Sequence, residues 1–291
     1  MRILSLVAAL SILPSAIAAQ NFVTNGDFAA GLTGWTETGF SVAPGIESFD
    51  VTGLGASQCY GAGHGGQTAP APYPPNSIKQ QIIVAAGLPY EFSMDICVNR
   101  TVLTTNADAG TFYVQVGGVE VARVALGGYA TLEFARARLT SRFVSNQSGP
   151  LDLEIFMHRN YTASTTTPRA RIDNISVSIA PGPVFVWQGT RKVNVTRTIG
   201  ADGEPNAPYA FLIAGGRTGG IALPPIQGTL FLDPTSIANF FGGAFDAQGR
   251  SRFALPVPND PALTAVVLYV QGGHLSGGSL VLGTDQFLQF Q

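Results

Sequence analysis

The sequence is poor in charged residues, although it has enough hydrophobic ones for a packed core. Charged residues make up 12% of the 291 positions, about half of the quarter that is usual for globular proteins. Hydrophobic residues make up 45%, which is too many for a disordered segment. The formal net charge is −2. This charge argues against a nucleic-acid partner, because such proteins carry a basic excess.

Long apolar runs are also missing. The apolar residues 3–13 follow Arg2 and precede the small-residue pattern Ala16-Ile17-Ala18, as in a secretory signal. This run is much shorter than the roughly 20 residues that a membrane-spanning helix needs. We therefore expect residues 1–19 to be a signal peptide. The protein is then secreted, extracellular or on the cell surface, without membrane insertion.

Cysteine is scarce, with Cys59 and Cys97 as the only two. An even pair in an exported protein predicts a disulfide, which would contribute about 3 to 4.5 kcal/mol by restricting the unfolded chain. The alternatives are two free thiols or a metal site. A metal site is the weaker alternative, because no histidine or further cysteine lies nearby at the spacing of metal ligands.

Most of the chain alternates apolar and polar residues with a period of two, which predicts half-buried β-strands separated by Gly- and Pro-rich turns. Helical patterns are almost absent, and only residues 235–241 predict one short helix, capped by Thr235 or Ser236. The clearest predicted strands are residues 80–84, 90–98, 111–116, 132–139, 151–158 and 171–179 in the first half, and 192–199, 209–214, 228–232, 252–257, 263–270 and 278–288 in the second.

Two prolines and a glycine in Ala180-Pro181-Gly182-Pro183 cannot continue a central strand, so they predict a domain boundary. Short strands at this spacing favour sandwiches or jelly rolls. We expect an all-β chain, with a jelly-roll β-sandwich over residues 20–181 and a smaller β-sandwich over residues 182–291.

Two short motifs lie at the ends of the first predicted domain. Asn25-Gly26-Asp27-Phe28 is followed by Gly34-Trp35, and Asp173-Asn174-Ile175 closes the segment. Together they resemble the galactose-binding-like jelly roll of carbohydrate-binding modules in secreted polysaccharide-acting enzymes. The resemblance covers about residues 21–179 and does not extend to the second domain. It implies that the two motifs form the first and last strands of one sandwich, with Phe28 close to Asp173, and that the tryptophan mainly packs.

The resemblance also implies a structural calcium ion where the first and last strands meet. In the family, an acidic residue after the Phe of the opening motif and the Asp of the closing motif bind the ion, with carbonyl oxygens completing the shell. Asp173 matches the closing ligand. The opening acid has no match, because Ala29 and Ala30 follow Phe28, and Asp27 is the residue that can substitute.

Strand alternation also selects a set of polar and aromatic side chains that point away from the core. If their strands are neighbours, they share a surface that suits a glycan, because rings contact the apolar faces of sugars while carboxylates and amides bind hydroxyls. These residues are Asp95, Tyr113, Gln115, Glu154, Phe156 and His158. A Gly/Pro-rich loop offers a rim for a cleft, through Tyr60, His64 and Tyr73. The alternative is an ordinary solvated sheet face with incidental aromatics.

Patterns of catalytic sites are not convincing. Residues 61–66 satisfy Gly-x-Gly-x-x-Gly as letters, but Pro-rich sequence follows instead of a helix. No Gly-x-Ser-x-Gly elbow occurs, and the three histidines are isolated. Asp95 and Glu154 could in principle form the acid and base of a glycosidase, whose carboxylates lie about 5 to 9.5 Å apart, but only the assignment of strand faces supports this pair.

We therefore expect a secreted, non-catalytic carbohydrate-binding protein that acts on extracellular or cell-surface polysaccharide and requires no cofactor. The first alternative is a structural or adhesive surface or matrix protein without sugar specificity, in which low charge favours self-association. The second, less favoured, is a glycoside hydrolase or lyase.

Overall fold

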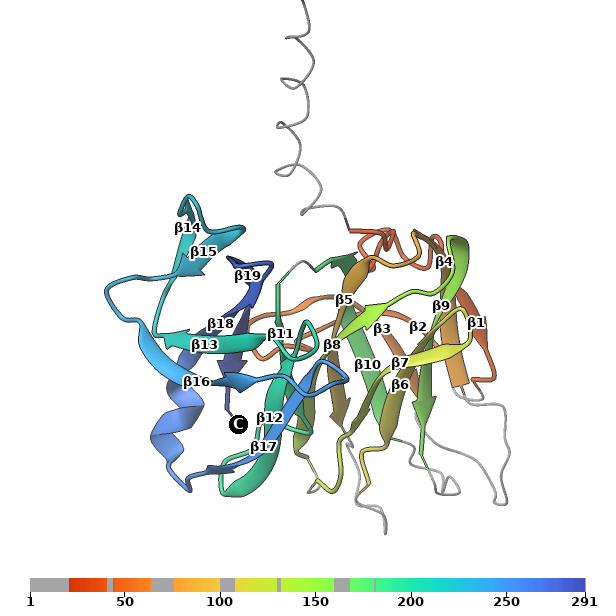
Figure 1. The fold of residues 1–291 in the computed structure, drawn as a ribbon. Helices are drawn as coiled ribbons and strands as arrows, with labels where there is room; N and C mark the ends of the chain where they lie inside the picture. Colours follow the sequence, from red (N-terminus) through yellow and green to blue (C-terminus); the bar gives the residue numbers. More distant parts are fainter. Residues whose placement is uncertain are drawn as a thin grey trace, which may run out of the picture.

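The computed structural model describes residues 21–40, 44–63, 76–99, 108–129, 132–159, 168–180 and 182–290. Across these ranges the chain folds almost entirely into antiparallel strands (Figure 1), which confirms the predicted all-β class. The helical element within them is one short 3-10 helix, Pro261–Ala265. No helix in the described ranges is long and apolar enough to cross a membrane. The predicted signal peptide lies outside the described residues.

Two five-stranded sheets form the N-terminal part and pack face to face (Figure 1). Sheet A has the strand order β1 (Thr36–Thr38), β4 (Asn76–Val84), β9 (Gly149–His158), β6 (Thr111–Val116) and β7 (Val119–Ala125). Sheet B has the order β2 (Gly45–Phe49), β3 (Ser57–Gly63), β10 (Arg169–Ile179), β5 (Pro89–Asn99) and β8 (Phe134–Val144).

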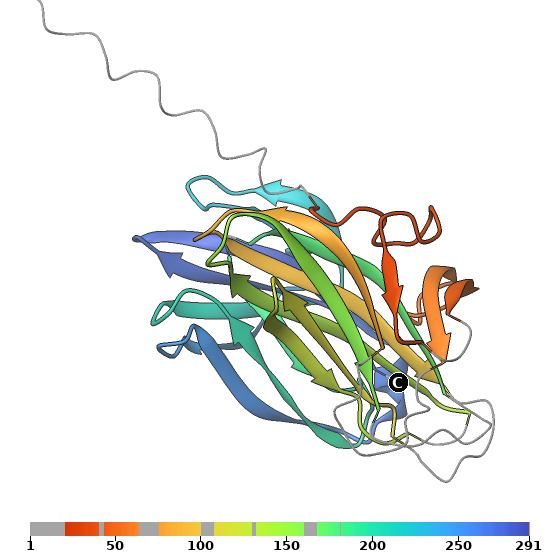
Figure 2. The ribbon, with the colours of Figure 1, turned by 90° about the vertical axis from the view of Figure 1, so that its right-hand side faces the viewer.

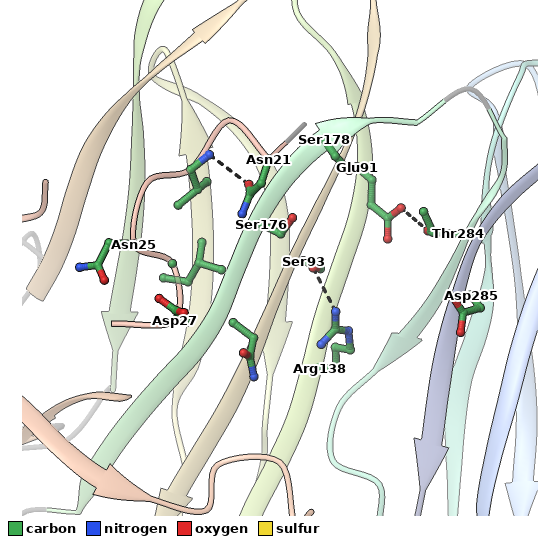
Figure 3. Close-up of a pocket in the computed structure, with 14 residues that line it drawn as sticks. Asn21, Asn25, Asp27, Glu91, Ser93, Arg138, Ser176, Ser178, Thr284 and Asp285 are labelled. Carbon is green, nitrogen blue, oxygen red and sulfur yellow. Dashed lines mark hydrogen bonds between the residues drawn. The ribbon is translucent and has the colours of Figure 1, made fainter. Parts of the chain in front are cut away.

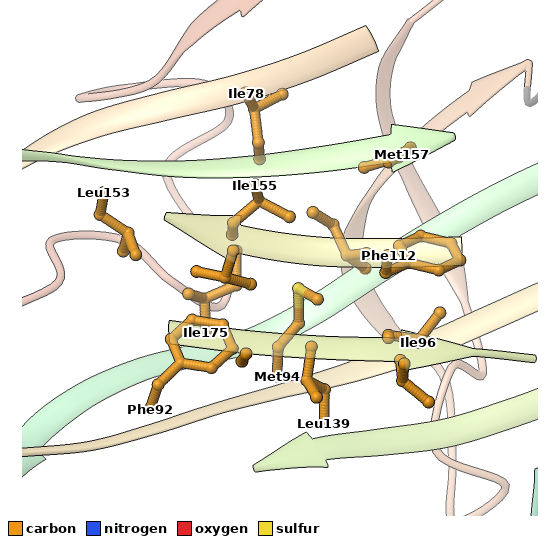
Figure 4. Close-up of a cluster of buried hydrophobic side chains, with 14 of the residues drawn as sticks. Ile78, Phe92, Met94, Ile96, Phe112, Leu139, Leu153, Ile155, Met157 and Ile175 are labelled. Carbon is orange, nitrogen blue, oxygen red and sulfur yellow. The ribbon is translucent and has the colours of Figure 1, made fainter. Parts of the chain in front are cut away.

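The core between sheets A and B follows from the alternation along the strands. On β5, the side chains of Phe92, Met94 and Ile96 are fully buried and face sheet A, as the period-two pattern predicts. Figure 4 shows them against Phe112 of β6 and Ile155 of β9. Burying one such side chain contributes about 1.5 to 3 kcal/mol. The packing therefore fixes which face of each strand is left for other contacts.

The C-terminal part consists of two further sheets and a hairpin around a second, aromatic core. Phe185, Phe211 and Phe241 form the centre of this core, and the rings of Phe211 and Phe241 stack with centroids 5.0 Å apart. Sheet C has the order β11 (Val184–Gln188), β12 (Val195–Asp202) and β17 (Arg250–Val257). Sheet D has β16 (Ala238–Ala244), β13 (Pro208–Ala214), β18 (Val267–Ser276) and β19 (Ser279–Gln289), and the hairpin is β14 (Arg217–Ala222) with β15 (Thr229–Leu232).

The C-terminal part covers the outer face of sheet B. The hydroxyl of Thr140 on β8 donates a hydrogen bond of 2.7 Å to the carbonyl oxygen of Phe185, and Arg142 donates one of 3.0 Å to the carbonyl oxygen of Gly203. Figure 2, viewed from the right of Figure 1, shows the C-terminal strands behind the N-terminal sandwich. Sheet A lies on the opposite side, away from this contact. The predicted boundary falls between the two cores, but Pro181 itself lies outside the described residues.

The two ends of the N-terminal part lie side by side, as the resemblance implied, but Asn25-Gly26-Asp27-Phe28 forms bends and turns rather than the expected first strand. The amide of Ile175 on β10 donates a hydrogen bond of 2.9 Å to the carbonyl oxygen of Gly26, and the amide of Phe22 donates one of 2.8 Å to the carbonyl oxygen of Val177. Phe28 and Ile175 belong to the same buried core. The opening and closing motifs therefore belong to one sandwich.

Two predicted elements are wrong. The short helix predicted over residues 235–241 is absent, since strand β16 occupies Ala238–Ala244 and pairs with β13. The strand predicted over residues 263–270 begins only at Val267, because Asp260 caps the 3-10 helix by accepting a hydrogen bond from the amide of Ala262. In both places local propensity is overridden, in the first by sheet pairing and in the second by a capped turn.

Candidate functional site

Five of the six side chains predicted to share a surface lie together on the outer face of sheet A. β6 and β9 are direct neighbours, and their register pairs Thr111 with His158, Tyr113 with Phe156, and Gln115 with Glu154. Side chains in directly opposite positions are close neighbours in a sheet. We call this set the sheet A face, and it comprises Tyr113, Gln115, Glu154, Phe156 and His158.

The centre of the sheet A face is a stack of rings. Tyr113 and Phe156 are almost parallel, with an interplanar angle of 6° and centroids 4.6 Å apart. On β7, the Arg123 guanidinium lies 5.2 Å from the centroid of the Tyr113 ring, a cation–π contact. These neighbours occupy the faces of the Tyr113 ring. The hydroxyl and edge of Tyr113 are then the groups that can meet a ligand.

Polar groups surround this stack. Glu154 Oε1 accepts a hydrogen bond of 2.7 Å from the Ser77 hydroxyl on β4, and Arg123 is bound by Glu120 through two hydrogen bonds of 2.8 and 2.5 Å. Gln115, Glu154 and His158 are each partly exposed. The face therefore offers donors and acceptors to solvent beside a largely buried aromatic pair.

Electrostatics keep the Tyr113 phenol neutral and Glu120 charged. Desolvation raises the pKa of Tyr113, and the positive charge of Arg123 opposes this shift without cancelling it. The hydrogen bond from Arg123 lowers the pKa of Glu120. At neutral pH the phenol hydroxyl can thus both donate and accept hydrogen bonds.

Asp95 does not belong to the sheet A face, which corrects the sequence prediction. It lies on β5 in sheet B, between β8 and β10, and only 3% of the residue is exposed. Its carboxylate forms an ion pair of 2.9 Å with Arg138 and accepts a hydrogen bond of 3.0 Å from the side-chain amide of Asn174. Alternation correctly gave Asp95 the side opposite the core, but this side faces the C-terminal part rather than solvent.

The same topology separates Asp95 from Glu154. The two carboxylates point outward from opposite sheets, so both layers of the sandwich lie between them. Stacked sheets are already about 10 Å apart, which exceeds the separation of a glycosidase pair. These two residues therefore cannot act as the acid and base of one glycosidase site.

The two cysteines are free thiols, which corrects the predicted disulfide. Cys59 lies on β3 and Cys97 on β5, and both are fully buried. Strand β10 runs between β3 and β5. Two steps between strands amount to about 9.6 Å, whereas bonded cysteines have Cα atoms about 4.4 to 6.8 Å apart. The intervening strand prevents the bond.

Asp173 is engaged by hydrogen-bond donors. It is fully buried, and its carboxylate accepts hydrogen bonds from the Ser57 hydroxyl at 2.5 Å and from the backbone amide of Asn174 at 2.7 Å. Burial raises its pKa, the Ser57 hydrogen bond opposes this shift, and Asp27 is among the charges that raise it. Asp27 itself accepts a hydrogen bond of 3.3 Å from the Ala29 amide.

The side chains proposed to bind calcium already have hydrogen-bond partners. Both carboxylate oxygens of Asp173 already accept hydrogen bonds, and Ala29 has no oxygen in its side chain. In the described ranges no group of three or more His, Cys, Asp or Glu side chains could hold a metal ion. The melting temperature with and without calcium distinguishes the ion that the resemblance implies from the hydrogen bonds seen here.

The predicted loop rim is only partly described. Tyr60 is fully buried in the core, with its ring 6.0 Å from that of Phe28 and 5.7 Å from that of Phe40, so it is no rim residue. Its place on β3 inside the sandwich explains the difference. His64 and Tyr73 lie outside the described residues. Trp35 also packs on Phe28, with centroids 5.7 Å apart.

Sequence analysis missed the polar groups gathered between sheet B and the C-terminal part. Glu91 on β5 is 7% exposed, and Arg191 after β11 is 6% exposed with its guanidinium 4.9 Å from the Phe287 centroid. Desolvation lowers the pKa of Arg191 to about 10. The sequence signal for this region was the set of polar residues on the outer face of β5, from Glu91 to Asn99, which only Cys97 interrupts.

No protein-family model matches the chain, and no curated protein matches it. A xanthan lyase from Paenibacillus aligns with 90% of this chain and 26% of its own, at 10% identity and a TM-score of 0.34. The N-terminal CBM22-1-CBM22-2 tandem domain of Xyn10C from Paenibacillus barcinonensis aligns with 84% of this chain and 87% of its own, at 12% identity and a TM-score of 0.37. A β-glucuronidase from Parabacteroides merdae aligns with 74% of this chain and 28% of its own, at 9% identity and a TM-score of 0.26. The chain thus spans only about a quarter of the two enzymes.

Proposed function

We propose that the protein is a secreted, non-catalytic glycan-binding protein and that the sheet A face contacts the glycan. The observation that carries this proposal is the register of β6 and β9, which places an aromatic pair and a Gln–Glu pair in successive rows of one face. This face lies on the side of the sandwich away from the C-terminal part (Figure 1), so the described residues of the C-terminal part do not cover it.

The chemistry of the face suits hydroxyl-rich polymers. Gln115 offers an amide donor and acceptor, Glu154 offers carboxylate oxygens, and the neutral Tyr113 phenol offers both functions. Same-face rows along a strand are about 7 Å apart, so successive rows can contact successive units of an extended chain. Because the ring faces of Tyr113 are already occupied, hydrogen bonding contributes more to this binding than stacking does.

Affinity electrophoresis of the full chain in gels that contain individual polysaccharides tests this proposal. The protein should be retarded by at least one polysaccharide of a broad panel. Gln115→Ala should reduce the retardation, while Gln248→Ala, a matched change at an exposed turn far from the face, should not. No retardation anywhere in the panel, or equal retardation of both variants and the parent, would contradict the proposal.

One observation favours the alternative of a self-associating surface protein. The outer face of sheet D carries an apolar groove of about 280 Å³. The leucines in its lining include Leu212, Leu280 and Leu275, and Leu275 is 48% exposed. Exposed apolar surface favours association between copies. Sedimentation velocity over a range of protein concentrations distinguishes the two functions, because assembly without sugar supports the adhesive one and a strict monomer speaks against it.

A further inference from the structure

A cavity of about 600 Å³ lies on the outer side of sheet B, where the C-terminal part meets the N-terminal sandwich. Its walls come from the opening segment, from β5, β8 and β10 of sheet B, and from β19 of sheet D (Figure 3). We call it the seam cavity. Its volume falls within the range of about 300 to 1,000 Å³ that is typical of sites for small molecules.

Polar groups dominate the lining of the seam cavity. The register of β5 and β10 places Ser178 opposite Glu91 and Ser176 opposite Ser93, so all four side chains point to the same side of sheet B. Arg138 of β8 donates a hydrogen bond of 3.2 Å to the Ser93 hydroxyl. Among the lining residues there is no aromatic side chain. The cavity therefore has little to offer an apolar molecule.

The N-terminal sandwich and the C-terminal sheets both contribute to this site. The hydroxyl of Thr284 on β19 donates a hydrogen bond to the carboxylate of Glu91 on β5, and Figure 3 shows the two side chains facing each other. The neighbouring Asp285 also lines the cavity and forms an ion pair of 2.5 Å with Arg217. The wall that β19 supplies would be missing from the N-terminal sandwich alone.

The charges in the wall decide which kind of ligand fits. The four charged lining residues are Asp27, Glu91, Arg138 and Asp285. Arg138 is already paired with Asp95 at 2.9 Å, and Asp285 is paired with Arg217. The remaining carboxyl groups, on Asp27 and Glu91, disfavour an anion. The remaining lining groups are hydroxyls, amides and carboxyls, so the cavity offers both hydrogen-bond donors and acceptors.

We propose that the seam cavity binds a small, neutral, hydroxyl-rich molecule of the mono- or disaccharide class, and that completing this site is a role of the C-terminal part. A sugar hydroxyl both donates and accepts hydrogen bonds. In this cavity it can donate to the carboxyl group of Glu91 or Asp27. It can accept from Arg138, Ser93 or Asn174. This site is separate from the sheet A face, because the outer faces of sheets A and B point away from each other.

Saturation-transfer NMR with the full chain and a panel of glucose, galactose, mannose, xylose, cellobiose and lactose tests this site. At least one sugar should receive saturation at millimolar concentration. Ser176→Trp, which fills the cavity from β10, should remove the part of the signal that arises in the seam cavity, whereas Thr196→Trp on the exposed side of β12 should leave the signal intact. Ser178→Trp, at the next same-face position of the strand, replaces Ser176→Trp if that variant does not fold.

A second variant tests the contribution of the C-terminal part. Thr284→Val keeps the shape of the side chain but removes the hydroxyl that binds Glu91, and it should weaken sugar binding about three- to tenfold. Tyr113→Ala should leave binding in the seam cavity unchanged, which separates this site from the sheet A face. Absence of saturation for the whole panel, or undiminished binding by a folded Ser176→Trp or Ser178→Trp chain, would overturn the proposal.

Discussion

The amide of Ile175 donates a hydrogen bond of 2.9 Å to the carbonyl oxygen of Gly26, and this contact joins the first residues of the described chain to the last strand of the N-terminal sandwich. It leaves no room for a side chain at Gly26. A Cβ atom there would lie 2.0 Å from the carbonyl oxygen of Ile175. The contact therefore requires glycine for reasons of space.

We expect Gly26→Ala to reduce the free energy of unfolding by about 1 to 3 kcal/mol, because the new methyl group forces the two backbones apart. Urea denaturation measures this change. Gly45→Ala is the matched control, since its Cβ would meet nothing within 4 Å, and it should be close to neutral. Equal stability of both variants would mean that the opening segment is not packed on β10.

The free cysteines give a second prediction. Burial raises the pKa of Cys59 to about 12 and that of Cys97 to about 11, so the reactive thiolate is rare at neutral pH. Both thiols should resist iodoacetamide in the folded protein and react after unfolding. A reducing agent should leave the melting temperature unchanged, and a clear fall on reduction would instead demonstrate a disulfide.

The same two groups predict a loss of stability at alkaline pH. Both have folded-state pKa values above the ordinary value of 9.0. Their contribution is therefore fully present below about pH 9 and is lost as pH rises toward their folded-state values. Chemical denaturation between about pH 8 and pH 10.5 should show a shallower decline for the double variant Cys59→Ala, Cys97→Ala than for the parent.

Calcium binding provides a further test. The carboxylate of Asp173 already accepts hydrogen bonds from Ser57 and Asn174, so we expect the melting temperature to be the same in calcium and in a chelator. Asp27→Asn, which removes the second charge near Asp173, should not change this result. A marked rise of the melting temperature in calcium, lost in Asp27→Asn, would show that an ion replaces these hydrogen bonds as the family resemblance implied.

The buried Glu91 gives another prediction. Burial raises its pKa above the ordinary value of 4.5, although the Thr284 hydrogen bond and Arg138 oppose the shift. Its contribution to stability is thus present below about pH 4.5 and is lost as pH rises through the raised value. Glu91→Gln should match the parent at about pH 4 and become the more stable of the two toward about pH 7. A glutamine variant that is less stable at neutral pH would contradict this sign.

Much of the sandwich could be predicted from alternation, because each strand has one apolar face. On β5 the pattern correctly gave Phe92, Met94 and Ile96 to the core. The same pattern gave Asp95 to the other face but could not tell whether water or protein covers it. The answer depends on how the C-terminal sheets pack on sheet B, and the alternation of apolar and polar residues along a strand contains no information about this packing.

The order of the strands within the sheets was the second feature that the sequence could not predict. Period-two patterns gave β6 and β9 the right faces, and these strands are neighbours, so most of the sheet A face could be predicted. The same patterns assigned the residues of β5 to the correct faces, but β5 belongs to sheet B, whereas β6 and β9 belong to sheet A. The cysteine pair failed for the same reason, because sequence spacing does not show that β10 lies between β3 and β5. The family resemblance correctly joined the opening and closing motifs.

The docking of the C-terminal sheets on sheet B has a practical consequence for dissecting the molecule. A shortened chain that ends near residue 180 would open to water the side of β5 that holds Glu91 and Asp95, both nearly inaccessible in the whole protein. The ion pair between Arg138 and Asp95 would then be exposed to water and would contribute little to stability. Assays on such a fragment would report on a surface that the intact protein does not display.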